Sequence, residues 1–354
     1  MLTDLQSGAS ESDAPELRAA LPDHPRLAAD DTCASAELRS LITGCGVYIL
    51  ADRGKILITG EDRTRWLNGM VTNNVRDLAA DHGVYAFLLN PQGRIQGDLY
   101  AFNRGADILL DVDRGQAANL LAVFDHYIVM DDVLIEDATN QLAAIGLQGP
   151  KARMVLEASG IAVPELEQLQ IASLTWRGSG VTLVRAEAWK GEAYEIWLEP
   201  EQVAAALEAL RQAGATSVGA AAQRLFRMAA GIPLFGEDIR ERDLPQETGQ
   251  ERALHFAKGC YVGQEIVERI RSRGQVHRVF SGFELTAPCG AGDKIEAEGK
   301  EVGEITSTAN FPAPDGNRRI ALGYLRREAF TKALTVHGAP VHRRELPFQE
   351  LLQP

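Results

Sequence analysis

The sequence predicts an α+β protein of several domains, the last of which is a small all-β barrel. Its 354 residues, 45% of them hydrophobic and 24% charged, have ordinary globular composition but exceed what one compact core holds. The order strand, helix, two strands, helix, strand is typical of a split βαβ unit, and a second unit of the same kind follows the first. From Phe280 onward, short β-like runs alternate with Gly, Pro and Asp-Gly turns, which indicates the all-β domain.

The first unit begins near Gly46, after residues 1–45, which we expect to be a flexible extension rich in Ala, Ser, Asp and Pro. Alternating apolar and polar residues predict two strands around the turn Asp52-Arg53-Gly54, and Pro91-Gln92-Gly93 predicts a hairpin. The expected elements are two strands in 47–60, a helix in 61–75, strands at 84–90, 95–102 and 107–112, a helix at 115–129 and a strand at 131–138.

The second unit runs from about Asn140 to Gly214 and shares only the order of elements with the first. Its expected elements are a strand at 143–149, a helix at 151–159, strands at 181–188 and 194–199, and a helix at 201–213. The β-like runs of the last domain are 280–285, 294–299, 301–308 and 320–325.

Charge and cysteine usage exclude several classes of protein. The net charge of −13 argues against nucleic acid as the main partner, because phosphate binding needs clustered positive charge. The four cysteines form no CxxC pair, and the histidines form no HxH or HExxH pattern, so we expect no disulfide framework and no intrinsic metal. The sequence has no apolar run long enough to span a bilayer, and it does not open with a secretory signal. These two observations predict a cytoplasmic protein that does not bind a membrane.

The segment 229–278 holds too many charges and glycines for a core element and too many functional side chains for a linker. Within Lys258–Glu265, Gly259 leaves the Cys260 thiol unhindered and Lys258 is placed to lower its pKa. Gly263 permits a tight turn into a helix whose first turn holds Gln264. The alternative is that Cys260 is a small buried hydrophobe, as free cysteines often are.

A basic cluster follows this motif, in contrast to the acidic chain. It consists of Arg269, Arg271, Arg273, His277 and Arg278. One interpretation is a solvated helix face, and the other is an electropositive rim that holds a polyglutamate tail or an acidic partner. The mixed charges of 237–243 are compatible with a salt-bridged surface loop.

Leu244-Pro245-Gln246-Glu247 followed by Lys258–Glu265 resembles the signature of the folate-binding YgfZ proteins, in the superfamily of the glycine-cleavage T protein. The resemblance covers roughly 46–345 and implies a three-domain cloverleaf around a central channel that holds tetrahydrofolate or a one-carbon derivative. It also implies that Cys260 borders this channel. The implied domains are 46–139 with 220–275, then 140–219, and the barrel domain 276–354.

Candidate site residues carry over from the resemblance one at a time. Glu195, in Gly191-Glu192-Ala193-Tyr194-Glu195, matches the carboxylate that binds the pterin, and Arg227 matches an arginine of the family. Without the resemblance, they read as an exposed strand residue and a helix-surface cation. Asp98 follows Gly97 where aminomethyltransferases carry two adjacent aspartates, so only one candidate acid or base remains. Tyr261 and Gln264 are the other expected cofactor-binding residues.

Three functions remain open at this point. The first is a tetrahydrofolate-binding protein that supports assembly or repair of iron–sulfur clusters in client proteins, with Cys260 as the working residue. The second is a folate-dependent aminomethyltransferase or demethylase that depends on Asp98. The third is a structural adaptor, which predicts no folate binding.

Overall fold

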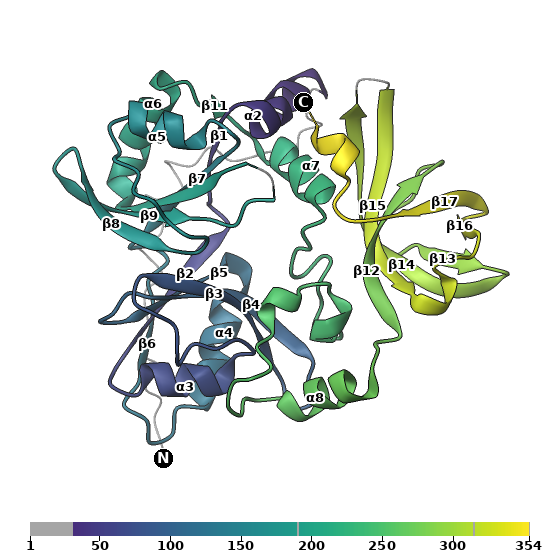
Figure 1. Ribbon diagram of the computed structural model, residues 1–354, viewed down its shortest axis with the longest axis horizontal. Coiled ribbons are helices and arrows are strands. Elements are labelled where there is room, and N and C mark those ends of the chain that lie inside the picture. The colour runs from purple at the N-terminus through teal and green to yellow at the C-terminus, as the bar shows by residue number, and fades with distance from the viewer. Residues whose placement is uncertain (1–30, 190, 314–315, 354) are drawn as a thin grey trace, which may run out of the picture.

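The computed structural model describes residues 31–189, 191–313 and 316–353, which form three lobes around a common centre (Figure 1). The lobes are built on a five-stranded sheet, a six-stranded sheet and a closed six-stranded barrel. This confirms the predicted α+β class with its C-terminal barrel. Residues 1–30 of the predicted extension lie outside the described residues, and its last part forms helix α2 (Asp31–Thr43). No helix in the described ranges is long and apolar enough to cross a membrane.

The first sheet has the strand order β3-β4-β5-β2-β6, and two helices cover one of its faces. Its elements are β2 (Arg53–Thr59), α3 (Arg63–Met70), β3 (His82–Leu89), β4 (Ile95–Asn103), β5 (Ile108–Asp113), α4 (Arg114–His126) and β6 (Leu134–Asp137). Alternation along β4 places Leu99 and Ala101 in the core beneath α3 and α4. Asp98 and Tyr100 therefore point to the opposite face, toward the second lobe.

The second sheet has the order β11-β1-β7-β10-β9-β8. Its elements are β1 (Gly46–Ile49), β7 (Ala143–Gln148), α5 (Ala152–Ala158), β8 (Ile171–Trp176), β9 (Ser179–Arg185), β10 (Ala193–Leu198), η1 (Pro200–Gln202), α6 (Val203–Gln212) and β11 (Thr216–Ser217). The predicted grouping places residues 46–49 with the first unit, but β1 pairs with β7 in the second sheet, Tyr48 opposite Gly146. The two sheets meet face to face, and the Phe102 and Trp197 rings lie edge to face at 4.9 Å.

The barrel closes where β17 pairs with β12. Its elements are β12 (Arg278–Leu285), β13 (Lys294–Ala297), β14 (Lys300–Ala313), β15 (Gly316–Arg326), η4 (Arg327–Ala329), β16 (Leu334–Val336), β17 (Ala339–Arg344) and η5 (Gln349–Leu352). Helix α7 (Ala220–Ala230) contributes Phe226 to an apolar cluster that also contains Phe280 and Phe311 of the barrel and Leu38 of α2. The barrel is thus attached to the rest of the chain by an apolar core of its own.

The chain returns to the first sheet after α7, largely without regular structure. This return segment, residues 231–263, contains only η2 (Pro245–Glu247) and η3 (Glu251–Ala253), and it leads into α8 (Gln264–Arg273). Ile239, Leu254 and Val267 pack with Phe87 and Leu89 of β3 in one apolar cluster. The segment therefore covers the end of the first sheet, while the domain boundaries that the sequence suggests stay a prediction.

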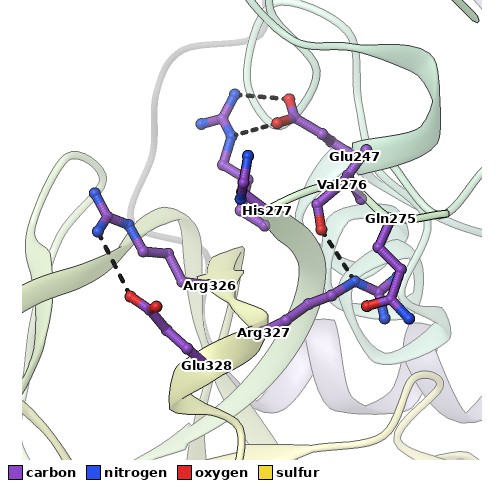
Figure 2. A pocket seen from close by; sticks show the side chains of 8 residues that line it. Glu247, Gln275, Val276, His277, Arg326, Arg327 and Glu328 are labelled. Carbon is purple, nitrogen blue, oxygen red and sulfur yellow. Dashed lines mark hydrogen bonds and ion pairs between the residues drawn. The ribbon is translucent and has the colours of Figure 1, made fainter. Parts of the chain in front are cut away.

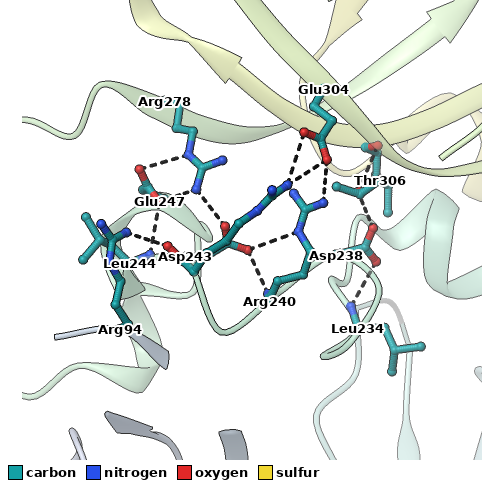
Figure 3. A network of polar contacts seen from close by, with 12 residues as sticks. Arg94, Leu234, Asp238, Arg240, Asp243, Leu244, Glu247, Arg278, Glu304 and Thr306 are labelled. Atoms are coloured by element: carbon teal, nitrogen blue, oxygen red, sulfur yellow. Dashed lines mark hydrogen bonds and ion pairs between the residues drawn. The ribbon is translucent and has the colours of Figure 1, made fainter. Parts of the chain in front are cut away.

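Buried acids fasten the return segment to the barrel (Figure 3). The Asp238 side chain is fully buried and accepts hydrogen bonds from Thr306 Oγ1 at 2.5 Å, from Ser307, and from the Leu234 amide at 3.0 Å. Its other bond is an ion pair with Arg227 at 2.6 Å. The Asp243 carboxylate, also buried, pairs with Arg278 at 2.7 Å. These contacts replace the backbone ladder that the segment lacks.

Asp238→Ala is expected to destabilise the protein by about 3–5 kcal/mol, because it removes the buried carboxylate shared by Arg227, Thr306, Ser307 and the Leu234 amide, and leaves buried donors without an acceptor. Urea unfolding followed by tryptophan fluorescence measures the loss. Glu241→Ala removes an exposed acid from the same loop and should change stability by less than about 0.5 kcal/mol. Equal effects of the two substitutions would show that Asp238 does not hold the segment in place.

Candidate functional site

Strand alternation presents Asp98 on the face of the first sheet that looks toward the second lobe. Its carboxylate is half-buried and accepts hydrogen bonds from the Tyr85 hydroxyl at 2.7 Å and from Gln116 Nε2 at 3.0 Å. Burial, with the neighbouring Asp98 charge, raises the pKa of Tyr85 well above its ordinary value. Tyr85 therefore remains a hydrogen-bond donor at neutral pH, and Asp98 keeps further acceptor capacity.

Arg252 of the return segment joins this group. Its guanidinium lies 4.1 Å from the centre of the Tyr85 ring and pairs with Glu187, which follows β9 of the second lobe. The Tyr100 hydroxyl donates to the same Glu187 carboxylate at 2.8 Å. We call Asp98, Tyr85, Tyr100, Glu187 and Arg252 the Asp98 cluster. Three separate parts of the chain meet in it.

Glu195, on β10 of the second sheet, belongs to a neighbouring group. Its carboxylate is half-buried and accepts a hydrogen bond from Trp197 Nε1 at 2.8 Å, and the Lys55 Nζ atom lies 4.2 Å from the centre of the Trp197 ring. The buried Asp111 carboxylate pairs with Lys55 at 2.9 Å and with Arg53 at 3.0 Å. We call these five residues the Glu195 cluster.

Burial is the main cause that raises the pKa of Glu195, and the Asp111 charge adds to it. Lys55, Trp197 and Arg53 oppose this shift, but they do not cancel it. For Asp111, burial opposes ionisation, but Arg53 and Lys55 outweigh it and lower the pKa of that carboxyl. Asp111 is therefore the acid that stays charged, and Glu195 is the acid whose ionisation is costly.

Arg53 connects the two clusters electrostatically. Burial alone would lower its pKa, yet the Asp111, Glu195 and Asp98 charges together raise it. Its guanidinium also lies 5.7 Å from the centre of the Tyr100 ring. Asp98 and Glu195, two of the residues expected from the sequence, therefore face one shared charged region between the sheets.

Arg227 is expected in the same site, but the structure gives it other partners. Its guanidinium donates to Asp238 at 2.6 Å, to the Ile232 carbonyl at 2.8 Å and to Glu237 at 3.3 Å. These contacts attach α7 to the return segment, and no described contact connects Arg227 with Glu195. The arginine that does lie with Asp98 is Arg252, which sequence reasoning missed although it falls within the unusual segment 229–278.

The Cys260 motif forms an ordered surface loop beside α3. Cys260 itself is exposed, which excludes the interpretation as a buried small hydrophobe. Lys258 is 6% exposed, and its Nζ donates to the carbonyls of Asn68, Val71 and Asn73 at 2.6–2.7 Å. The sequence suggested that Lys258 acidifies the thiol, but its ammonium group is occupied by the carbonyls at the end of α3.

Burial, and to a smaller extent Arg76, lowers the pKa of Lys258 to about 7. The three carbonyl acceptors favour its charged form, because a neutral amine has only two hydrogens to donate.

Tyr261 and Gln264 support this loop from within. The Gln264 amide oxygen accepts a hydrogen bond from the Tyr261 amide at 3.3 Å. Gly263 has a φ of 80°, and a Cβ atom there would lie 2.6 Å from the Asn90 carbonyl, so the turn requires glycine. Tyr261 packs at the edge of the apolar cluster that includes Tyr85. The loop and the Asp98 cluster therefore pack against the same apolar core. Among the residues that the structure describes, no hydrogen bond joins the two.

The described residues include no group of three or more His, Cys, Asp or Glu side chains placed to hold a metal ion. What the site offers instead is a pair of half-buried carboxylates, aromatic rings and several guanidinium groups. Such a set can accept hydrogen bonds from a flat, nitrogen-rich ring and stack against it.

Glu195→Gln tests the electrostatics of the site through stability. Because the pKa of Glu195 is higher in the folded chain than its ordinary 4.5, ionisation favours unfolding, and stability is lost as pH rises through the folded-state pKa. The variant should therefore be more stable than the parent at pH 7–8, and the difference should vanish below about pH 4.5. Melting curves between pH 4 and 8 measure this, with Glu199→Gln as an exposed control. A difference that does not change with pH would contradict the assignment.

Comparison with known proteins agrees with this architecture. Residues 23–258 match the family model described as the GCVT N-terminal domain. The aminomethyltransferase of Rubrobacter xylanophilus is 29% identical over 322 residues, which are 88% of this chain and 85% of that protein. A chloroplastic protein of Arabidopsis thaliana described as a transferase is 25% identical over 295 residues, 83% of this chain and 68% of its own length.

Among solved structures, the glycine cleavage system aminomethyltransferase T from Bartonella henselae superposes with a TM-score of 0.80. The match covers 90% of both chains at 22% sequence identity, so it supports the fold. Together with the match over residues 23–258, these likenesses show that the chain belongs to the GCVT family, the family of the glycine-cleavage aminomethyltransferases.

Proposed function

We propose that this protein binds a tetrahydrofolate-type cofactor between its first two lobes. The observation that carries the proposal is that Asp98 and Glu195, which come from different sheets, lie on the same strand faces as Tyr100 and Trp197, which pack in one cluster between the sheets. The 2-amino group and ring N–H of a pterin can donate two parallel hydrogen bonds to one carboxylate. Such donors favour the charged form of Glu195, so a bound pterin would offset the cost of ionising it.

The surroundings of the two carboxylates suit the rest of such a ligand. Tyr85 and Tyr100 lie with their ring centres 4.9 Å apart and offer aromatic surface beside Asp98. Arg252 supplies a positive charge at the same place. Trp197 and Tyr48 border Glu195 on the second sheet, and burial followed by the Glu195 charge raises the pKa of Tyr48, which keeps its hydroxyl protonated.

We further propose that the physiological role is support of iron–sulfur cluster assembly or repair in client proteins, with Cys260 as the working residue. The support is the exposed thiol on a loop that Lys258 and Gly263 hold in one conformation. A fixed, accessible thiol is suited to contact with a protein partner or with a folate one-carbon unit.

The alternative is folate-dependent aminomethyl transfer or demethylation. It is favoured by the aminomethyltransferases among the relatives and by the hydrogen-bonded Asp98, which is placed to act as a general acid or base. Both functions need the cofactor and they differ in the residue that acts after it is bound. Turnover of a methylene-loaded lipoyl carrier that is lost in Asp98→Asn would establish the alternative.

Glu195→Gln should weaken binding of tetrahydrofolate roughly tenfold to a hundredfold, because it removes a charged acceptor of two hydrogen bonds. Anaerobic calorimetric titration of the purified protein measures this effect, and Glu199→Gln on the adjoining turn should bind as the parent does. If the parent shows no heat of binding with tetrahydrofolate or its 5-formyl derivative, the cofactor proposal is wrong and the adaptor function gains support.

Cys260→Ser should leave folding and tetrahydrofolate affinity unchanged, yet abolish rescue of iron–sulfur enzyme activity in cells that lack the protein. The physical reason is that Ser keeps the shape of the exposed loop but offers no thiolate. Cys289→Ser is the matched control, since Cys289 is a half-buried free cysteine of the barrel domain. Full rescue by Cys260→Ser would sink the assigned role of the thiol.

A further inference from the structure

A surface pocket of about 610 Å³ lies where the chain enters the barrel, and no residue of the Asp98 or Glu195 cluster lines it (Figure 2). Its walls are residues 275–278, which connect α8 to β12, and residues 326–328 at the end of β15, with Glu247 at one edge. An adjoining pocket of about 380 Å³ shares Glu247 and residues 275–277 and adds Arg269. The proposed function uses neither pocket.

The basic residues that the sequence singled out divide into two groups here. Arg269 and Arg271 lie on the exposed surface of α8 and pair within the helix, with Glu265 at 3.2 Å and Glu268 at 3.5 Å. Arg278 is committed as well, because it bonds Glu247 at 2.9 Å and Asp243 at 2.7 Å. The Arg278 side chain therefore forms part of the pocket wall, and its charge is already neutralised by these two carboxylates.

The available positive charge comes from the barrel, and His277 adds a ring nitrogen that can donate a hydrogen bond. Arg327 donates from Nε to the Val276 carbonyl at 3.2 Å, which holds the side chain across the pocket (Figure 2). Among the residues that the structure describes, the side chain of Arg326 has one long ion pair, with Glu328 at 3.7 Å, and both side chains are exposed. In the described part of the chain, no acidic side chain pairs with Arg327 or with His277.

This arrangement differs from an ordinary solvated surface in two respects. The Arg327 guanidinium is held in place before any ligand arrives, so less side-chain entropy is lost on binding. Arg326 and Arg327 on one wall and His277 on the other also line one concavity, and the chain around them has a net charge of −13. Guanidinium groups that keep free N–H donors in a concave site recognise planar or tetrahedral oxyanions.

We propose that this pocket binds a small molecule that carries two or more oxyanion groups, carboxylate or phosphate. A single anion would engage one of Arg326 and Arg327, whereas two or three anionic groups can contact both together with His277. The pocket volume lies in the range of small-molecule sites. Tricarballylate and inorganic pyrophosphate are the probes that separate the two sources of this chemistry.

The test is calorimetric titration of the full-length protein with each probe in about 50 mM salt, where exposed charges are weakly screened. At least one probe should bind, and Arg326→Gln with Arg327→Gln should weaken it about tenfold or more. Glu328→Gln should tighten binding severalfold, because it removes the competing acid. Arg211→Gln, an exposed arginine on α6, is the matched control and should change nothing.

Failure of both probes to bind, or equal affinity in the parent and the double variant, would overturn the proposal. Melting curves show whether the double variant folds, and the tightening in Glu328→Gln provides a test that does not depend on that variant. Tetrahydrofolate titrations distinguish this site from the cofactor site, since Arg326→Gln with Arg327→Gln should leave tetrahydrofolate affinity unchanged.

Discussion

The ion triad of Asp111 with Arg53 and Lys55 is the interaction on which the rest of the site depends. Lys55 and Asp111 are almost completely buried between the two sheets, where an unpaired charge would cost several kcal/mol. One carboxylate compensates two cations, so the triad itself keeps a positive charge. Glu195 and Asp98 are then served by neutral donors, Trp197 and Tyr85 among them, and keep lone pairs for a ligand.

Local patterns in the sequence predicted many of the strands and helices, because alternation and turn chemistry act over a few residues, but they missed β8 and the barrel strands β16 and β17. They could not assign β1, since the same four residues can pair with either sheet and the choice depends on partners about 100 and 170 positions away. The charged interface was missed for a similar reason. A lysine in an alternating strand, such as Lys55, reads as solvent-exposed unless the facing sheet is known.

The residues of the Cys260 motif were identified from the sequence, but the part that each plays was not. Lys258 lies two positions from Cys260, so proximity suggested an effect on the thiol, yet its nitrogen bonds three carbonyls nearly 190 positions earlier in the chain. Arg227 is similar, because its role depends on where Asp238 lies. Roles that depend on long-range hydrogen bonds are set by tertiary structure, so they cannot be predicted from the spacing of residues along the chain.

The two proposed functions make different use of the same core. In the aminomethyl-transfer alternative, Asp98 is the acting residue, and its carboxylate accepts a hydrogen bond from the Tyr85 hydroxyl at the interface between the sheets. Cys260 is exposed, while the next residue, Tyr261, packs against the apolar cluster that contains Tyr85. A thiol in that position is better suited to a partner protein than to a reaction at a pterin held by Glu195. The exposed position of this thiol therefore supports the proposal that cofactor binding and the action of Cys260 occur on neighbouring but separate surfaces.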